Sequence, residues 1–182
     1  MATLDARCLD AFPNWLRSLG EDARALASVL EKEGSGAAQQ RAAAALNYLF
    51  KSLDLIPDGL EDLGFIDDAF VVRAAADAVK QESESELALD PSGALSRLAD
   101  EADLVREFLG AEYARLAKYV AGLEQGSARG RSVASILADA AVRADFVREV
   151  RQWADSYAVP SFTRDERNLV KLRSFLLAKL PA

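Results

Sequence analysis

Six acidic side chains lie within residues 54–68, and their spacing makes this segment the main candidate for chemistry. The four that a helical hairpin would bring together are Asp54, Asp58, Asp67 and Asp68. Clusters that offer only oxygen ligands suit Mg²⁺ or Ca²⁺. A bound Mg²⁺ can activate a water molecule or hold a phosphate group. One hypothesis is therefore a metal-dependent enzyme, of the phosphoesterase type, that uses this aspartate cluster.

The same aspartates also have a structural interpretation, which we prefer. Asp54 and Asp58 can accept backbone amide hydrogens in a turn, as aspartates commonly do. Asp67 and Asp68 would lie near the start of the next helix, where a carboxylate opposes the positive end of the helix dipole. We expect one of this pair to accept hydrogen bonds from the free amides at residues 55–58 and so to hold the hairpin closed. Metal binding by the four aspartates stays the alternative.

The residue types that dominate enzyme active sites are absent or nearly so. The chain has no histidine, and its only cysteine is Cys8. These counts exclude Ser-His-Asp and Cys-His catalysis, histidine-ligated zinc and an intrachain disulfide. We expect the Cys8 thiol to be inert, because no histidine can act as its base. The composition therefore favours a protein that is not an enzyme and has no resident cofactor, with Mg²⁺ or Ca²⁺ as the alternative.

Hydrophobic spacing is helical nearly everywhere, and no run alternates with the period of a β-strand. Helices are predicted to end at Gly20, at the Gly-Ser-Gly sequence 34–36 and before Pro160. Thr163, followed by Glu166, is a capping-box signature for the last helix. The predicted helices span about residues 9–19, 21–33, 37–51, 60–80, 92–109, 113–126, 132–157 and 163–180. The predicted fold class is all-α, a bundle of about seven or eight helices built around a helical hairpin.

Charge and composition suggest how the chain is organised. The segment 81–91, in which glutamates alternate with serines, is predicted to be an exposed acidic linker. We expect a single helical domain over residues 1–182, with N-terminal helices in 1–80, including the hairpin at 37–80, and C-terminal helices in 92–182. The net charge is −7, with a balance of −9 in residues 1–91. An acidic first half argues against nucleic-acid binding, because phosphate contacts need clustered lysine and arginine.

Eleven positions between residues 48 and 68 form a motif with a recognisable spacing. They are Tyr48, Leu49, Asp54, Leu55, Ile56, Pro57, Asp58, Leu63, Gly64, Asp67 and Asp68. The motif resembles that of the YkvA-like family, a bacterial domain of unknown function, and the resemblance covers about residues 37–80. It implies a helical hairpin and brings no activity with it. Ser52 and Glu61 stand where the family commonly has proline, so a less rigid turn is expected here.

The remaining observations concern location and partners. The longest stretch without a charged residue, 42–50, has nine residues, far fewer than the roughly 20 that a bilayer requires. No apolar signal segment begins the chain, and we expect a soluble cytoplasmic protein. Five arginines between residues 129 and 151 are interpreted as a solvated charged face. Residues 163–182 form a basic amphipathic helix, a type that packs on its own domain, contacts an anionic membrane surface peripherally or docks into a partner.

These observations favour a non-enzymatic helical protein that acts through protein–protein or membrane-surface contacts. Its protein partner is unidentified, and a homo-oligomer is compatible with the alanine-rich third predicted helix, residues 37–51.

Overall fold

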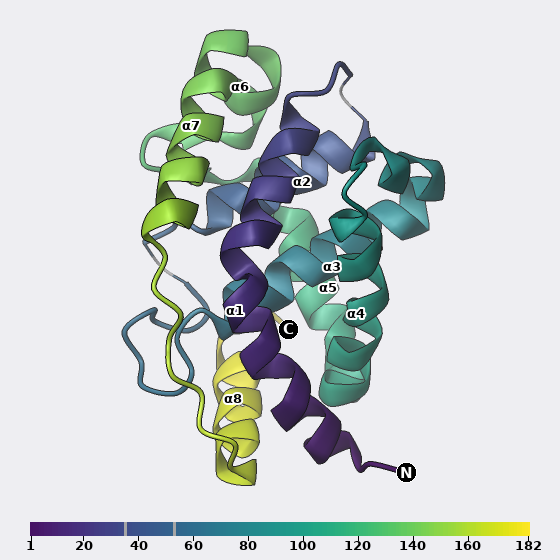
Figure 1. The fold of residues 1–182 in the computed structure, drawn as a ribbon, viewed down its shortest axis with the longest axis vertical. Coiled ribbons are helices and arrows are strands. Elements are labelled where there is room, and N and C mark those ends of the chain that lie inside the picture. The colour runs from purple at the N-terminus through teal and green to yellow at the C-terminus, as the bar shows by residue number, and fades with distance from the viewer. Residues whose placement is uncertain (35, 53) are drawn as a thin grey trace.

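The computed structural model describes residues 1–34, 36–52 and 54–182 and confirms the predicted all-α bundle (Figure 1). Ser35, expected in the Gly-Ser-Gly loop, and Leu53, expected in the turn, lie outside the described residues. The helices are α1 (Leu4–Leu30), α2 (Ala37–Tyr48), α3 (Ile66–Ser83), α4 (Ala94–Leu109), α5 (Tyr113–Gly122), α6 (Val133–Ala138), α7 (Ala140–Ser156) and α8 (Glu166–Lys179). Short 3₁₀ helices are η1 (Glu84–Leu89), η2 (Gly110–Glu112) and η3 (Leu123–Gln125), and strands β1 (Ser127–Ala128) and β2 (Arg131–Ser132) form a small antiparallel hairpin.

Helix α1 is continuous, so the prediction of two helices separated at Gly20 is wrong. The helix passes through Gly20 because its apolar face continues unbroken on either side, with Leu16, Leu19 and Ala23 all buried. A buried apolar stripe outweighs the cost of about 1 kcal/mol for one glycine inside a helix. A Cβ at position 20 would lie 3.4 Å from the Ala154 carbonyl oxygen, which is ordinary van der Waals contact, so α1 lies close to α7 at this point and has room for a small side chain.

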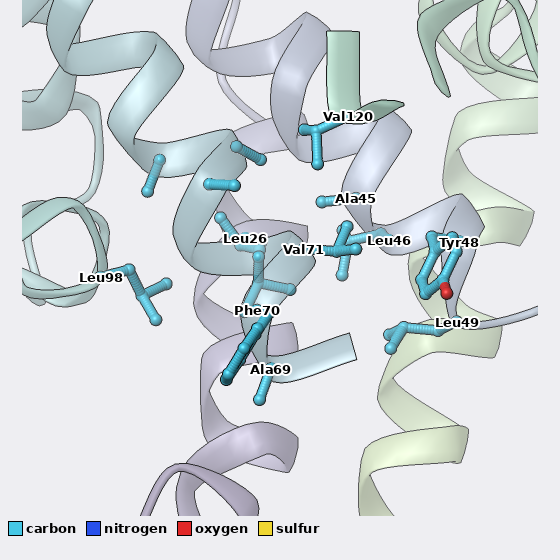
Figure 2. Packing of buried hydrophobic residues seen from close by; sticks show 14 of the residues in the cluster. Leu26, Ala45, Leu46, Tyr48, Leu49, Ala69, Phe70, Val71, Leu98 and Val120 are labelled. Carbon is cyan, nitrogen blue, oxygen red and sulfur yellow. The ribbon is translucent and has the colours of Figure 1, made fainter. Parts of the chain in front are cut away.

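The hairpin of α2 and α3 lies at the centre of the bundle, as the motif predicts. The two helices pack on each other, and both are buried along most of their length. Small residues of α2 such as Ala45 allow this close contact, and Phe70 and Val71 of α3 fill the space between the surrounding helices (Figure 2). The hairpin therefore acts as the support on which the other helices pack.

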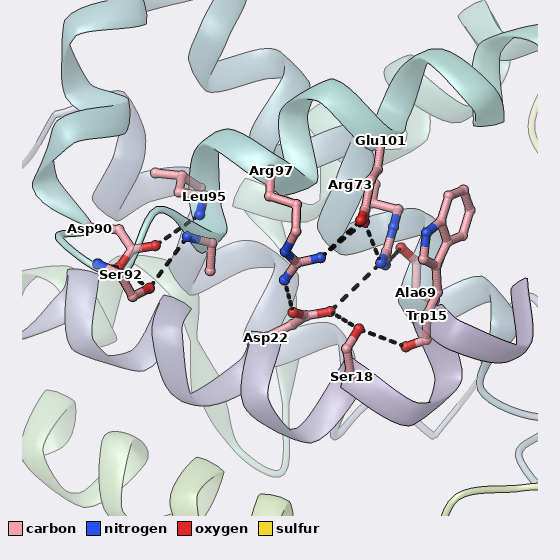
Figure 3. A network of polar contacts seen from close by, with 11 residues as sticks. Trp15, Ser18, Asp22, Ala69, Arg73, Asp90, Ser92, Leu95, Arg97 and Glu101 are labelled. Atoms are coloured by element: carbon pink, nitrogen blue, oxygen red, sulfur yellow. Dashed lines mark hydrogen bonds and ion pairs between the residues drawn. The ribbon is translucent and has the colours of Figure 1, made fainter. Parts of the chain in front are cut away.

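A buried ionic network joins α1, α3 and α4 beside this core (Figure 3). The Arg73 side chain is fully buried, with its guanidinium 4.1 Å from the centre of the Trp15 ring. It forms ion pairs with Glu101 at 2.6 Å and with the buried Asp22 at 3.7 Å. Burial lowers the pKa of Arg73 to about 10, although both carboxylates oppose this shift. Arg97 pairs with Asp22 from the solvent side, so the network fixes the register of three helices.

Residues 81–91 are not an exposed linker, and that local prediction is wrong. They form the end of α3, the 3₁₀ helix η1 and a turn. Leu87 is buried, and Glu86 accepts a hydrogen bond of 2.7 Å from the Ala38 amide at the start of α2. Asp90 is buried and accepts hydrogen bonds from the amides of Ser92 and Leu95. These contacts pack the segment on the hairpin, which the acidic composition of the segment concealed.

The long helix predicted for residues 132–157 is interrupted at Asp139. This residue is extended, and its side chain caps α7 by accepting hydrogen bonds from the amides of Ala141 and Val142. Ser132 caps α6 in the same manner, at the Ser135 amide. Ser132 thus starts α6, and the cap at Asp139 divides one hydrophobic pattern into two helices.

Helix α8 packs on its own bundle, and its cap differs from the predicted capping box. Asp165 accepts a hydrogen bond from the Arg167 amide, while Thr163 donates its amide and hydroxyl hydrogens to Asp62 instead. Most of the apolar face that a membrane contact would need is buried in the core, although Val170 is exposed and Phe175 is half-buried. The buried leucines are Leu169, Leu172 and Leu176 of α8 and Leu180 directly after it. In the described ranges, no helix combines the length and apolar character needed to cross a bilayer.

Candidate functional site

The turn between α2 and α3 is closed by a chain of three hydrogen bonds. The Leu55 amide donates to the Tyr48 hydroxyl oxygen at 2.8 Å, and this hydroxyl donates to Oδ2 of Asp67 at 2.6 Å. The Ile56 amide donates to the same Oδ2 atom at 3.0 Å. The prediction that an aspartate at the start of the helix binds the turn amides is confirmed for Asp67. Leu55 and Ile56 are buried, as expected.

The loop that follows Pro57 is tight, and glycine is required at one point in it. A Cβ at Gly64 would lie 2.0 Å from the carbonyl oxygen of Asp58, so any larger residue would force the loop apart. Asp62 and Phe65 have left-handed backbone conformations, with φ of 64° and 65°. Such values are uncommon outside glycine. The loop therefore delivers the chain into α3 with Asp67 and Asp68 in the first helical turn.

The four predicted site aspartates differ in burial and in bonding. Asp67 and Asp68 are buried, with exposed fractions of 0% and 2%, whereas Asp54 is half-buried and Asp58 is exposed. Among the described residues, no turn amide donates to Asp54 or Asp58, so the expected bonds at these two positions are not found. Three buried carboxylate oxygens have no partner within the described chain; they are Asp54 Oδ1, Asp67 Oδ1 and Asp68 Oδ2.

Burial raises the pKa of all four aspartates. It raises the pKa of Asp54 to about 7, assisted by the charges of Asp58 and Asp67, and that of Asp67 to about 6 against the opposing hydrogen bonds from Tyr48 and Ile56. The pKa of Asp68 rises well above its ordinary value, because burial is reinforced by the neighbouring carboxylates. Desolvation also raises the pKa of Asp58. The cluster therefore retains protons at a pH where exposed aspartates are ionised.

The geometry around these aspartates bears directly on the metal hypothesis. Over the part of the chain that the structure describes, no three acidic or cysteine side chains are grouped so that they could hold an ion. Asp67 accepts hydrogen bonds from the turn, and its first-turn neighbour Asp68 is buried. In this arrangement the aspartates accept hydrogen bonds and retain protons.

A second candidate site lies on the surface beside the hairpin. The β1–β2 turn has positive φ at Arg129 and Gly130, of 50° and 76°, and it directs arginine side chains toward α7. The Arg129 guanidinium lies over the ring of Phe50, with its central carbon 4.7 Å from the ring centre. Phe50 lies just beyond the end of α2. A recess of about 440 Å³ lies here, lined by Phe50, Arg129, Arg131, Glu149, Gln152 and Trp153. We call it the arginine recess.

The five arginines predicted as a solvated face have specific contacts. Four of them bind groups of the chain: Arg131 pairs with Glu149, Arg143 with carbonyls at the end of α6, Arg148 with Asp145, and Arg151 with Glu31. Arg129 is different, because its guanidinium has no ion pair or hydrogen bond to any described residue and lies over an aromatic ring. Its charge still acts on the nearby Glu149, whose pKa it helps to lower. The only local sequence signal for this turn was Gly130, because the first position of such a turn usually holds Asn, Asp or Gly and here holds Arg129.

Aromatic side chains connect the arginine recess to the loop of the motif. Trp153 stacks on Tyr157 with ring centres 5.0 Å apart, and Phe65 packs against Tyr157 at 5.4 Å. The Tyr157 hydroxyl donates to the Leu16 carbonyl oxygen of α1, which fixes the end of α7. The wall of the arginine recess is thus held by the same loop that precedes α3.

Comparison with known proteins identifies the central hairpin. Residues 41–73 match the family model described as "Protein of unknown function (DUF1232)", and the YkvA-like motif between residues 48 and 68 falls inside this span. No curated protein and no solved structure matches the chain. The match covers most of α2, the turn and the first part of α3. It therefore includes Tyr48, Asp67 and Phe50, but neither the β1–β2 hairpin nor α7.

Proposed function

We propose that this protein is a non-enzymatic binding module that acts through protein–protein contacts, with the arginine recess as its contact site. The observation that carries the proposal is the state of Arg129, an exposed cation in a concave site with aromatic walls, where the one lining carboxylate, Glu149, forms its ion pair with Arg131. Arginine and aromatic side chains are the residues enriched where proteins bind one another. The inward-facing Asp67 and Tyr48 support the recess rather than contact a partner.

A contact with a protein is favoured over a contact with a membrane surface. The hydrophobic side of α8, including Leu172 and Leu176, is already buried against the rest of the bundle. An interfacial helix needs that side free to enter the headgroup region. Among the large hydrophobic residues of α8, Val170 is exposed, and a single exposed valine is a weak anchor compared with the buried leucines.

Reversing the charge of Arg129 is expected to reduce partner retention about tenfold or more, because a charge at the centre of a recess discriminates strongly against a mismatched partner. Tagged wild-type protein and the Arg129→Glu variant would be compared by quantitative co-purification. Arg17→Glu is the matched control, since Arg17 is also an exposed arginine without an ion pair and lies outside the recess. A partner retained equally by both variants would contradict the proposal.

A second candidate function is divalent-cation binding at the aspartate cluster, with a phosphoesterase activity as its enzymatic form. It is favoured by one observation, the three buried carboxylate oxygens of Asp54, Asp67 and Asp68 that have no partner in the described chain. Side chains would have to move to gather these oxygens around one ion.

Thermal unfolding in EDTA, Mg²⁺, Ca²⁺ and Mn²⁺ tests this second candidate. An ion at 100 times its dissociation constant adds about 2.7 kcal/mol of stability, which raises the melting temperature by several degrees. We expect that gain to disappear in Asp68→Asn if the cluster is the site. Melting temperatures that are identical in EDTA and in every ion would remove the cation-binding candidate and its phosphoesterase form.

A further inference from the structure

The charges that line the arginine recess restrict the kind of anion it can accept. Arg131 and Glu149 form a fork-shaped pair with N···O distances of 3.1 and 2.7 Å, so these two charges cancel locally. The pairing lowers the pKa of Glu149, first through the hydrogen bond from Arg131, and this carboxylate stays ionised at neutral pH. The net charge offered to a ligand is therefore close to +1, and Arg129 supplies it.

A singly charged carboxylate neutralises this site, and a phosphate monoester does not. A phosphate group carries a charge of about −1.5 to −2 at neutral pH. It would leave an excess negative charge beside Glu149, and like charges within a few ångströms repel by about 1 kcal/mol or more even in a solvated site. A guanidinium also presents paired N–H donors that match the two oxygens of a carboxylate. Charge balance and geometry both favour a carboxylate.

The walls of the recess add a second requirement. Trp153 lines the recess and is held in place by stacking on Tyr157 and by packing against Phe65, whose ring centre lies 6.2 Å from that of Trp153. Phe50 lies beneath Arg129 and holds that guanidinium from one side. A volume of about 440 Å³ exceeds what one carboxylate needs and falls in the range of small-ligand sites. The remaining space can receive an apolar or aromatic group next to the carboxylate.

From these observations we infer that the arginine recess recognises an aspartate or glutamate side chain of a partner protein, with an adjoining aromatic or apolar side chain placed against Trp153. This inference rests on the proposed function and adds the chemistry of the partner. Arg129 binds the carboxylate, and Glu149 selects against doubly charged anions. The bond to Glu149 keeps Arg131 in the wall of the recess.

The test uses benzoate as a probe, because it joins one carboxylate to one ring. Phenyl phosphate tests the doubly charged alternative, and benzamide tests the uncharged one. Nuclear magnetic resonance of the two indole N–H groups gives an internal control, since Trp153 lines the recess whereas Trp15 is buried in the ionic network. We expect benzoate to shift the Trp153 signal saturably and to leave the Trp15 signal unchanged, with phenyl phosphate several-fold weaker and benzamide inactive.

Two variants separate recognition from unfolding. Arg129→Gln is expected to reduce the affinity for benzoate about tenfold, and Glu149→Gln to raise the affinity for phenyl phosphate about tenfold. Each substitution removes one charge adjacent to the ligand. Damage to the fold would not strengthen binding. Arg17→Gln serves as the control and should bind benzoate as the wild type does.

Each outcome has a distinct meaning. Phenyl phosphate binding as tightly as benzoate would overturn the carboxylate preference, while the contact site tested by co-purification would stand. A Trp153 signal that no probe shifts would overturn the inference as a whole. Loss of partner retention in Arg129→Glu together with no response to benzoate would leave the proposed function in place and reject only the ligand chemistry.

Discussion

Replacing Asp67 with alanine is expected to lower the free energy of unfolding by about 2–5 kcal/mol at pH 5. Its Oδ2 atom accepts hydrogen bonds from the Tyr48 hydroxyl and the Ile56 amide, and all three residues are buried. Alanine leaves both donors in the core without an acceptor. Each unsatisfied buried polar group costs about 1–3 kcal/mol. Urea unfolding followed by circular dichroism measures the loss directly.

Related variants locate the effect in the hydrogen-bond chain. Asp67→Asn keeps an acceptor oxygen, so it should lower the free energy of unfolding by less than Asp67→Ala does, by about 1–2 kcal/mol. Tyr48→Phe removes the acceptor of the Leu55 amide, and its combination with Asp67→Ala should cost less than the sum of the two, because both act on one network. Glu61→Ala, in the same loop but exposed, should change stability by less than about 0.5 kcal/mol. An Asp67→Ala loss as small as that of Glu61→Ala would refute this role.

The motif allowed a correct prediction of the hairpin because its signals are local. Pro57 disfavours helix at the residue before it, and the steric limit at Gly64 acts within a few residues along the chain. The buried positions Leu55 and Ile56 follow from the same turn. Local sequence could also indicate that an aspartate near the start of α3 closes the turn. It could not indicate which of the two does so, since that depends on where the Tyr48 hydroxyl lies.

Several boundaries could not be predicted, because packing with distant residues overrides local preference. Gly20 signals a helix end, yet the contact between α1 and α7 requires a small residue inside a continuous helix. The glutamates of residues 81–91 suggest that this segment is exposed to solvent, but Glu86 accepts a hydrogen bond from the Ala38 amide at the start of α2. A capping side chain such as Asp139 breaks a helix without changing its hydrophobic spacing.

The ionic network and the arginine recess were beyond local reasoning for a related cause. Arg73 and Asp22 are far apart in sequence, and each looks like an ordinary surface residue until the helices that carry them pack. The recess likewise forms from three separate segments that contribute Phe50, Arg129 and Trp153. A hairpin with two residues in each strand is too short to produce an alternating pattern. Only the three-dimensional arrangement distinguishes Arg129 from the arginines around it.

Stability is expected to fall by about 1–3 kcal/mol as the pH rises from 5 to 8. In the folded protein, burial raises the pKa of Asp67 to about 6 and that of Asp54 to about 7, and it places the pKa of Asp68 well above its ordinary value. Above about pH 4, the folded chain therefore binds more protons than the unfolded chain. The stabilisation is fully present below about pH 4, where these carboxyls are protonated in both states, and it is lost progressively as the pH rises from there through the folded pKa values.

Replacing Asp68 with asparagine identifies the source of this slope and decides between the two roles of the cluster. Asparagine resembles a protonated aspartate, so Asp68→Asn should make the free energy of unfolding less dependent on pH and raise it at pH 8. The exposed control Asp145→Asn should keep the pH dependence of the wild type. The half-buried Tyr157, directly after α7, is close enough to feel the charges of Asp58 and Asp68, and its raised pKa keeps it protonated throughout this range. A cation held by the cluster would stabilise the ionised form, so Mg²⁺ or Ca²⁺ would then rescue the wild type at pH 8 and not the variant. Without such rescue, the unpaired oxygens belong to a structural turn that holds protons, and the cation-binding role of the cluster is rejected.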